Sequence, residues 1–153
     1  MIPLRDDNPR RTTPLVTRAL IVANTLAFFY ELSLGRDLGA FVQGWGLVPQ
    51  RLALAASGGE PLVSAGLTIF TSMFLHGGWV HLIGNMWYLW IFGDNVEDRL
   101  GHARFALFYL VGGVFAGLVH VLTNPGSNLP TVGRLDPGWV RVWIVPATHP
   151  EIR

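Results

Sequence analysis

The sequence predicts an all-α membrane protein with about three transmembrane helices, and three observations support this. Only 14% of the 153 residues are charged, whereas a typical soluble domain carries about 25%. An uncharged run extends from Pro61 to Gly93, which exceeds the roughly 20 residues that one helix needs to cross a bilayer. This run contains two histidines and an asparagine in the pattern HxxxxHxxxN, and polar groups at membrane depth are usually functional.

Charge, cysteine content and the N-terminal segment narrow the possible functions. The net charge of +1 is too balanced to suggest a nucleic-acid partner. The chain has no cysteine, which excludes disulfides and thiol chemistry. Residues 1–14 are polar and rich in arginine, without the apolar core and cleavage site of a secretory signal. We therefore expect them to form a cytoplasmic tail, followed by a span over residues 15–34.

The middle of the chain divides at its glycines and prolines. The first span is uncharged from Ala19 to Tyr30, and we expect Arg18 and Glu31 near its ends to reach the membrane interfaces. We expect residues 35–78 to form an interfacial and embedded loop. This loop would contain short helices and an irregular segment that leads to the next span. Gly77-Gly78 ends this approach, and the second span is predicted over residues 79–93.

A charged turn at residues 94–104 and a third span at residues 105–122 complete the predicted membrane region. The third span contains two pairs of small residues at four-residue spacing, Gly112/Ala116 and Gly113/Gly117, which suit close helix contact. Six arginines lie on the cytoplasmic side if the N-terminus is inside, against two between the first two spans. The positive-inside rule therefore predicts a cytoplasmic N-terminus.

The HxxxxHxxxN pattern comprises His76, His81 and Asn85. Residues four apart on a helix lie about 40° apart around its axis, so His81 and Asn85 share a face. His76 and His81 would lie about 140° apart on a continuous helix, and the run offers no carboxylate as a third ligand. We therefore expect no metal and no cofactor.

The shared face of His81 and Asn85 suits a different chemistry. An imidazole N–H and a carboxamide N–H aimed at one point can stabilise the oxyanion of a tetrahedral intermediate. The alternative is that these side chains only form hydrogen bonds to a neighbouring helix. The motif spacing, the flanking glycines and the position near the outer membrane surface favour the functional interpretation.

Four further motifs accompany this pattern. They are Gly46-Leu-Val-Pro49, Thr71-Ser-Met-Phe-Leu-His76, Met86-Trp-Tyr-Leu-Trp90 and Gly93-Asp-Asn-Val-Glu-Asp-Arg-Leu-Gly101. With them, the chain resembles the bacterial rhomboid intramembrane serine proteases from about Val16 to Gly133. The resemblance implies a bundle of six or more helices in the bacterial plasma membrane, with a Ser–His dyad that cleaves membrane-anchored substrates.

The resemblance also implies roles for individual residues. His81 and Asn85 would stabilise the oxyanion, and His76 would support them. Glu97 and Arg99 would form a structural pair that holds the turn after the second span, although a solvated charged loop explains these two residues equally well. The implied partners are membrane lipids and transmembrane helices, either as substrates or as binding partners, with no nucleic acid.

The sequence departs from the family after Gly133. Leu135 stands where the nucleophile of a Gly-x-Ser-Gly motif is expected, and residues 134–153 contain no apolar span that could carry the base histidine. We expect these residues to be an unrelated, disordered tail that arose from a frameshift or a truncated gene model. Ser72 and Ser127 lie outside any Gly-x-Ser-Gly motif, so we expect neither to replace the nucleophile.

Two functions remain open at this point. The first is a rhomboid-family serine endopeptidase, present as a truncated and inactive fragment. The second is a non-catalytic rhomboid-like membrane protein that binds transmembrane helices through its glycine-rich third span. A scaffold in which His81 and Asn85 only hold helices together is a third interpretation, and replacing Asn85 with leucine would then change stability alone.

Overall fold

The computed structural model describes residues 12–131, and the regular secondary structure of this part is helical apart from one isolated bridge between Leu47 and Thr131. This confirms the predicted all-α fold class. Three long helices are joined by shorter elements between the first and second of them. The long helices are α1 (Leu15–Ser33), α5 (Trp79–Leu100) and α6 (His102–Thr123). The short elements are η1 (Gly35–Asp37), α2 (Leu38–Trp45), α3 (Pro49–Ala56), α4 (Leu62–Thr71) and η2 (Ser72–Phe74).

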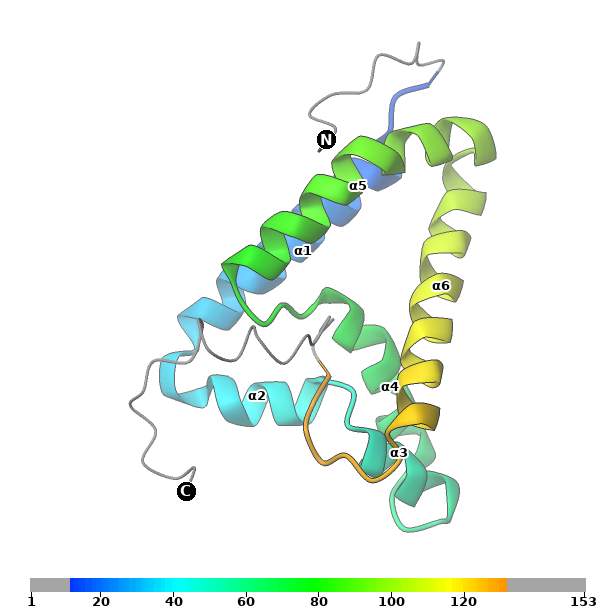
Figure 1. Ribbon diagram of the computed structural model, residues 1–153. Helices are drawn as coiled ribbons and strands as arrows, with labels where there is room; N and C mark the ends of the chain where they lie inside the picture. Colours follow the sequence, from blue (N-terminus) through cyan, green and yellow to red (C-terminus); the bar gives the residue numbers. More distant parts are fainter. Residues whose placement is uncertain (1–11, 132–153) are drawn as a thin grey trace.

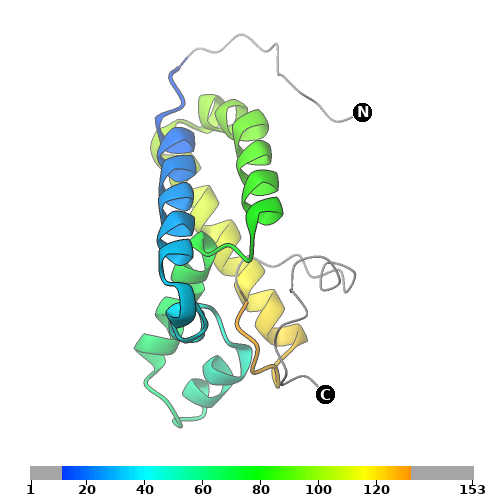
Figure 2. The ribbon, with the colours of Figure 1, turned by 90° about the vertical axis from the view of Figure 1, so that its left-hand side faces the viewer.

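The helices α1 and α5 form an antiparallel pair, and α6 leans away from it (Figure 1). Figure 2 shows the two paired helices side by side, with α6 behind them. The short helices α3 and α4 pack against α6 at the end opposite the α5–α6 connection. The protein therefore has two ends: one where α1 begins and α5 ends, and one where α5 begins above α2–α4.

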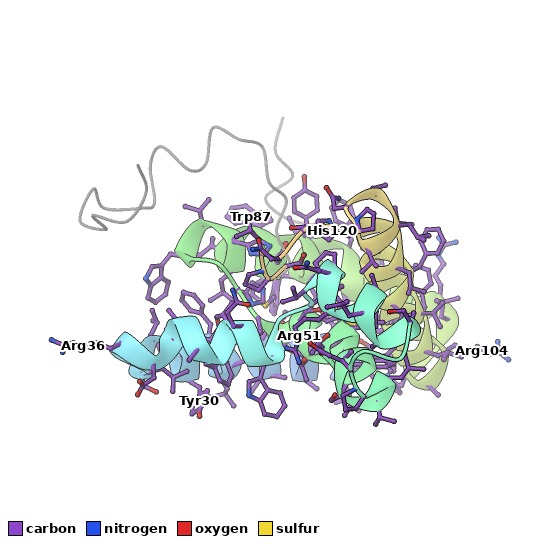
Figure 3. All side chains as sticks on the ribbon, turned by 90° about the horizontal axis from the view of Figure 1, so that it is seen from below. Tyr30, Arg36, Arg51, Trp87, Arg104 and His120 are labelled. Atoms are coloured by element: carbon purple, nitrogen blue, oxygen red, sulfur yellow. The ribbon has the colours of Figure 1, made fainter. Side chains whose placement is uncertain are left out.

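Two or three helices are candidates to cross a membrane. In the described range, α1 and α6 are long and apolar enough to do so. The helix α5 is uncharged only from Trp79 to Gly93, because charged residues occupy its last two turns. The arginines at the start of α1, the end of α5 and the start of α6 share one end of the molecule. Arg36 and Arg104 project outward on opposite sides in Figure 3.

The prediction of a charged turn over residues 94–104 was wrong. The helix α5 continues to Leu100 and α6 begins at His102, so Gly101 alone forms the turn. Its φ of +79° lies in the left-handed region that glycine adopts without a steric penalty. The charged residues of this segment therefore lie on a helix, where they can face α1.

The segment between α1 and α5 is more helical than the sequence indicated. The predicted irregular approach contains α4, ten residues long, and η2 directly after it. Only Leu75 to Gly78 is non-helical before α5 begins. Whether these short helices lie in the membrane interface stays a prediction.

One of the two predicted small-residue pairs makes a close helix contact. A Cβ at Gly113 would collide with the side chain of Met73, and a Cβ at Gly117 would lie 3.2 Å from Leu47 and 3.3 Å from Ile69. A Cβ at Gly112 would meet nothing within 4 Å. The Gly113/Gly117 face of α6 therefore packs on the short elements, while the Gly112 face is open. The predictions for Gly133 and residues 134–153 lie outside the described residues.

Candidate functional site

The loop before α5 brings His76 to the first turns of that helix. His81 and Asn85 lie on α5, whereas His76 lies in the non-helical segment ahead of it. Gly78 has a φ of +152°, which a residue with a side chain rarely adopts. The chain turns here, so that the imidazole centroids of His76 and His81 lie 5.0 Å apart. The separation expected for a continuous helix does not apply, because His76 is not part of it.

A single carboxamide joins the two imidazoles. Asn85 Nδ2 lies 2.9 Å from His81 Nε2 and 3.3 Å from His76 Nε2. An amide nitrogen only donates hydrogen bonds, so both Nε2 atoms accept and carry no proton. His76 Nδ1 in turn donates to the carbonyl oxygen of Phe74 at 3.1 Å. We call His76, His81 and Asn85 the His–Asn cluster.

The two N–H donors of Asn85 are occupied within the His–Asn cluster itself. Both hydrogens of the Asn85 amide point to imidazole nitrogens, and His81 Nε2 acts as an acceptor. Neither the Asn85 amide nor His81 Nε2 offers a free N–H to an oxyanion in this conformation, and the proton of the neutral His81 ring lies on Nδ1. Sequence reasoning correctly placed His81 and Asn85 on one face of a helix, but it did not anticipate that they would bind each other. Their role in stabilising an oxyanion stays a prediction.

The helix α1 holds the loop that carries His76. Glu31 is only 3% exposed, and its Oε1 accepts the backbone N–H of His76 at 3.1 Å. One turn earlier, Phe28 packs edge-on against Trp79, with ring centroids 5.0 Å apart. The expectation that Glu31 reaches the membrane interface was wrong, because the loop before α5 covers it. A carboxylate within an apolar helix was the signal that this residue has a buried partner.

An apolar groove lies beside the His–Asn cluster. It has a volume of about 420 Å³ and lies between α1, which contributes Thr25, and one side of α5. Leu82 and Met86 line it, and each directly follows a member of the cluster in the sequence. Because consecutive helical residues are about 100° apart, the groove and the cluster occupy adjoining faces of α5.

The other end of the α1–α5 pair is organised around Glu97, whose side chain is fully buried. Glu97 Oε1 accepts the N–H of Val16 at 2.8 Å and also meets His102 Nδ1. Its Oε2 accepts the N–H of Thr17 at 2.8 Å and the Thr17 hydroxyl at 2.7 Å. Glu97 therefore caps the free N–H groups at the start of α1 from a different helix. We call this arrangement the Glu97 junction.

The hydrogen bonds of the Glu97 junction favour the charged carboxylate. Glu97 lies beyond the uncharged stretch of α5, which ends at Gly93. Burial alone would raise the pKa of this carboxyl group, but the hydrogen bonds from Thr17, Val16 and His102 together hold its pKa below the usual value. Asp98 extends the contact by accepting the N–H and hydroxyl of Thr12.

The expected pair between Glu97 and Arg99 does not form. Arg99 is exposed, and the hydrogen-bond partners of Glu97 in the described range are on α1 and at the start of α6. Residues two apart on a helix do not face each other, which explains the difference. The contacts of Glu97 are thus made with α1 and the start of α6 instead of with Arg99.

The two serines considered as substitute nucleophiles are engaged elsewhere. Ser72 is buried and its hydroxyl donates to the carbonyl oxygen of Ile69 at 3.0 Å. Ser127 Oγ accepts the N–H of Leu129 at 3.4 Å. Both hydroxyls thus bond to the local backbone.

Comparisons with known proteins show which proteins the part of the chain with this site is similar to. The Rhomboid domain matches residues 64–134, which include the His–Asn cluster, α5 and α6. Rhomboid-like protein 11, chloroplastic, of Arabidopsis thaliana is 43% identical over 63 residues, which are 41% of this chain and 22% of that protein. Presenilin-associated rhomboid-like protein A, mitochondrial, of Danio rerio is 32% identical over 71 residues, which are 46% and 17% of the two chains.

A third relative has a similar extent. Rhomboid-like protease 5 of Toxoplasma gondii is 34% identical over 83 residues, which are 46% of this chain and 9% of that protein. The matched part thus spans less than a quarter of the length of each of these relatives. No solved structure matches the chain.

The limit of the family match agrees with the sequence. It ends at residue 134, directly after Gly133, where the motifs of the family stop. The helices α5 and α6 and the loop that carries His76 all lie inside it. Residues 64–134 of this chain thus match part of a Rhomboid domain, and two helices of the described range are long and apolar enough to cross a membrane.

Proposed function

We propose that the His–Asn cluster is the oxyanion-stabilising part of a rhomboid-type intramembrane serine endopeptidase site. The observation that carries the proposal is the convergence of His76, His81 and Asn85 at the start of α5, inside the Rhomboid match. The nucleophilic serine and the base histidine would come from helices that residues 134–153 do not encode. We therefore expect no proteolysis from these 153 residues alone.

The proposed reaction follows the chemistry of serine hydrolases. The serine Oγ would attack the carbonyl carbon of the scissile peptide while the base histidine takes the hydroxyl proton. Negative charge then develops on the carbonyl oxygen, where the Asn85 amide and a protonated ring nitrogen of His81 would donate hydrogen bonds. Collapse of this intermediate releases the amine, which takes up the proton, and water hydrolyses the acyl-enzyme.

Formation of the oxyanion site would require the cluster to rearrange. Asn85 has to release at least one imidazole, and His81 has to carry a proton on the nitrogen that faces the substrate. The apolar groove between α1 and α5 adjoins the cluster and would accept an apolar segment of the substrate. Binding of that segment could offset the cost of breaking the cluster.

A chimera tests the proposal. Residues 1–133 would be joined to the last three helices of an active bacterial rhomboid protease, and cleavage of a fluorogenic transmembrane substrate would be measured in proteoliposomes. In this chimera, Asn85→Ala and His81→Ala should each lower kcat by about 10²–10³ with little change in KM. Asn124→Ala, at the end of α6, is the control. Full activity of both cluster variants contradicts the proposal.

The second candidate function is the binding of transmembrane helices without catalysis. The open Gly112 face of α6 favours it, because Gly112 and Ala116 are exposed and a Cβ at Gly112 meets nothing. The Gly113 face is already covered and is therefore unsuitable. A labelled transmembrane peptide that binds the wild-type chain in micelles should then lose affinity on Gly112→Leu but not on Asn85→Ala.

A further inference from the structure

We propose that the His–Asn cluster binds one divalent transition-metal ion that favours imidazole ligands, such as Zn²⁺, between Nε2 of His76 and Nε2 of His81. Both nitrogens accept a hydrogen bond from the same atom, Asn85 Nδ2, at 3.3 and 2.9 Å. Both Nε2 atoms thus face the same small space. Unprotonated imidazole nitrogens are among the preferred ligands of zinc and copper ions.

Asn85 can supply the third ligand. Its amide nitrogen now lies 3.3 and 2.9 Å from the two Nε2 atoms, so an ion between these nitrogens would lie next to the Asn85 side chain. A half-turn about the Cβ–Cγ bond exchanges the amide nitrogen for the carbonyl oxygen, which is a metal ligand. Water would fill the remaining positions, since His81 and Asn85 are only partly buried. Such a set of two nitrogens and one oxygen leaves an open coordination position.

The surroundings of His76 support a metal ligand. Its Nδ1–H donates to the carbonyl oxygen of Phe74, and metal-binding histidines usually donate their other N–H to a carbonyl or carboxylate. This bond fixes the tautomer in which Nε2 is free to bind an ion. The ring also packs against Phe28 of α1, with the centroids 6.5 Å apart, which limits its rotation.

A buried carboxylate lies at the same loop. Glu31 accepts the backbone N–H of His76 and is 3% exposed, and within residues 12–131 no basic side chain forms an ion pair with it. A buried carboxylate without a cation is costly. A divalent ion held by the adjacent His76 ring would therefore be electrostatically favourable.

The ligand set also limits the affinity. Within the described part of the chain, no three His, Cys, Asp or Glu side chains gather around one point. Two imidazoles and a carboxamide are fewer and weaker donors than the four ligands of a structural zinc site. We therefore expect an affinity on the order of micromolar, suited to reversible occupation from the outer side. The bound ion would hold both Nε2 atoms and keep His81 from donating to a substrate.

Metal titration of the purified chain in dodecylmaltoside micelles tests the proposal and does not depend on proteolytic activity. Calorimetry with Zn²⁺ should show one saturable site per chain. Co²⁺ in its place should give visible absorption bands of a nitrogen-ligated ion. His76→Ala and His81→Ala should each weaken binding roughly tenfold or more. His102→Ala and His120→Ala, which lie outside the cluster, are the matched controls and should leave it unchanged.

A variant that is expected to tighten Zn²⁺ binding distinguishes the loss of a ligand from misfolding of the variants. Asn85→Asp replaces the carboxamide with a carboxylate of the same shape and should tighten Zn²⁺ binding by roughly tenfold or more. Absence of saturable binding up to millimolar Zn²⁺ overturns the proposal. Binding that follows His102 or His120, or that Asn85→Asp leaves unchanged, overturns it as well.

Discussion

The polar groups at the two ends of the α1–α5 pair are hydrogen-bonded in opposite ways. At the Glu97 junction, one carboxylate with no exposed surface accepts hydrogen bonds from two backbone N–H groups, a hydroxyl and an imidazole. At the His–Asn cluster, one partly exposed amide on α5 donates to two imidazoles, one on the same helix and one in the loop before it. The first arrangement is closed, whereas in the second Asn85 and His81 are partly exposed, and the two proposals above require it to exchange its partners for a substrate or an ion.

The largest expected effect comes from removing the carboxylate of the Glu97 junction. Glu97→Leu leaves the N–H groups of Val16 and Thr17 and the Thr17 hydroxyl without their acceptor. We expect a loss of about 3–5 kcal/mol in the free energy of unfolding, measured by denaturation in mixed micelles. Glu60→Leu is the control, because Glu60 is partly exposed in an ion pair with Arg51. A loss for Glu97→Leu no larger than for the control contradicts this account.

Steric contact at the same junction should have the next largest effect. A Cβ at Gly93 would lie 3.0 Å from atoms of both Thr17 and Leu89, so Gly93→Val forces α1 and α5 apart. Overpacking of this kind costs about 1–3 kcal/mol. Gly84→Val, on the same helix, meets nothing within 4 Å and should cost less. Equal losses in micelle denaturation for the two variants would show that the helices are not in close contact at Gly93.

The Glu97 junction should also weaken in acid. The folded protein holds the pKa of Glu97 below its usual value, so the unfolded chain binds the proton more readily. This stabilisation is therefore complete above the usual carboxyl pKa and is lost as the pH falls through the lowered value in the folded state. Denaturation curves measured against pH should show this loss in the wild type. Glu97→Gln, which does not titrate, should remove this part of the pH dependence.

A smaller effect is expected at the His–Asn cluster. Asn85→Leu removes two hydrogen bonds, and of the two imidazoles that lose them His81 is partly exposed whereas His76 is buried. Hydrogen bonds between side chains in membrane proteins are worth about 0.6 kcal/mol on average, so we expect a loss of about 1 kcal/mol. The ¹⁵N shifts of His76 and His81 should change in the same variant. A loss as large as that of Glu97→Leu would mean that the cluster is a structural site, with no freedom to exchange partners.

Features that depend on local spacing could be predicted from the sequence. Apolar runs located the long helices, and a spacing of four residues placed His81 and Asn85 on one face of α5. Gly93 and Glu97, which lie four residues apart further along α5, likewise share a face. Their common partner Thr17, however, lies 80 residues from Glu97 in the sequence. No local pattern indicates a contact of that separation.

The position of His76 could not be predicted for a different reason. It depends on the backbone of Gly77-Gly78, since a φ of +152° at Gly78 turns the chain back toward α5. Glycine tolerates many conformations, so a glycine in the sequence indicates a turn but not the direction in which the chain turns. The separation of about 140° between the two histidines holds only for a continuous helix, which the glycines interrupt here, whereas the lack of a carboxylate in the same run does not depend on the backbone.

The smallest expected effect is at Arg99, and it tests which partners hold the Glu97 junction. Both Glu97 oxygens already accept two hydrogen bonds each from Val16, Thr17 and His102, and Arg99 is exposed in the last turn of α5. Its remaining contribution is the favourable position of a cation at a helix C-terminus, about 0.3–1 kcal/mol. Arg99→Ala should therefore cost about as much in micelle denaturation as Arg104→Ala, a change of an exposed arginine at the start of α6. A cost close to that of Glu97→Leu would show that Glu97 and Arg99 do form a pair. The stability of the Glu97 junction would then depend on an ion pair within α5 instead of on the capping of α1.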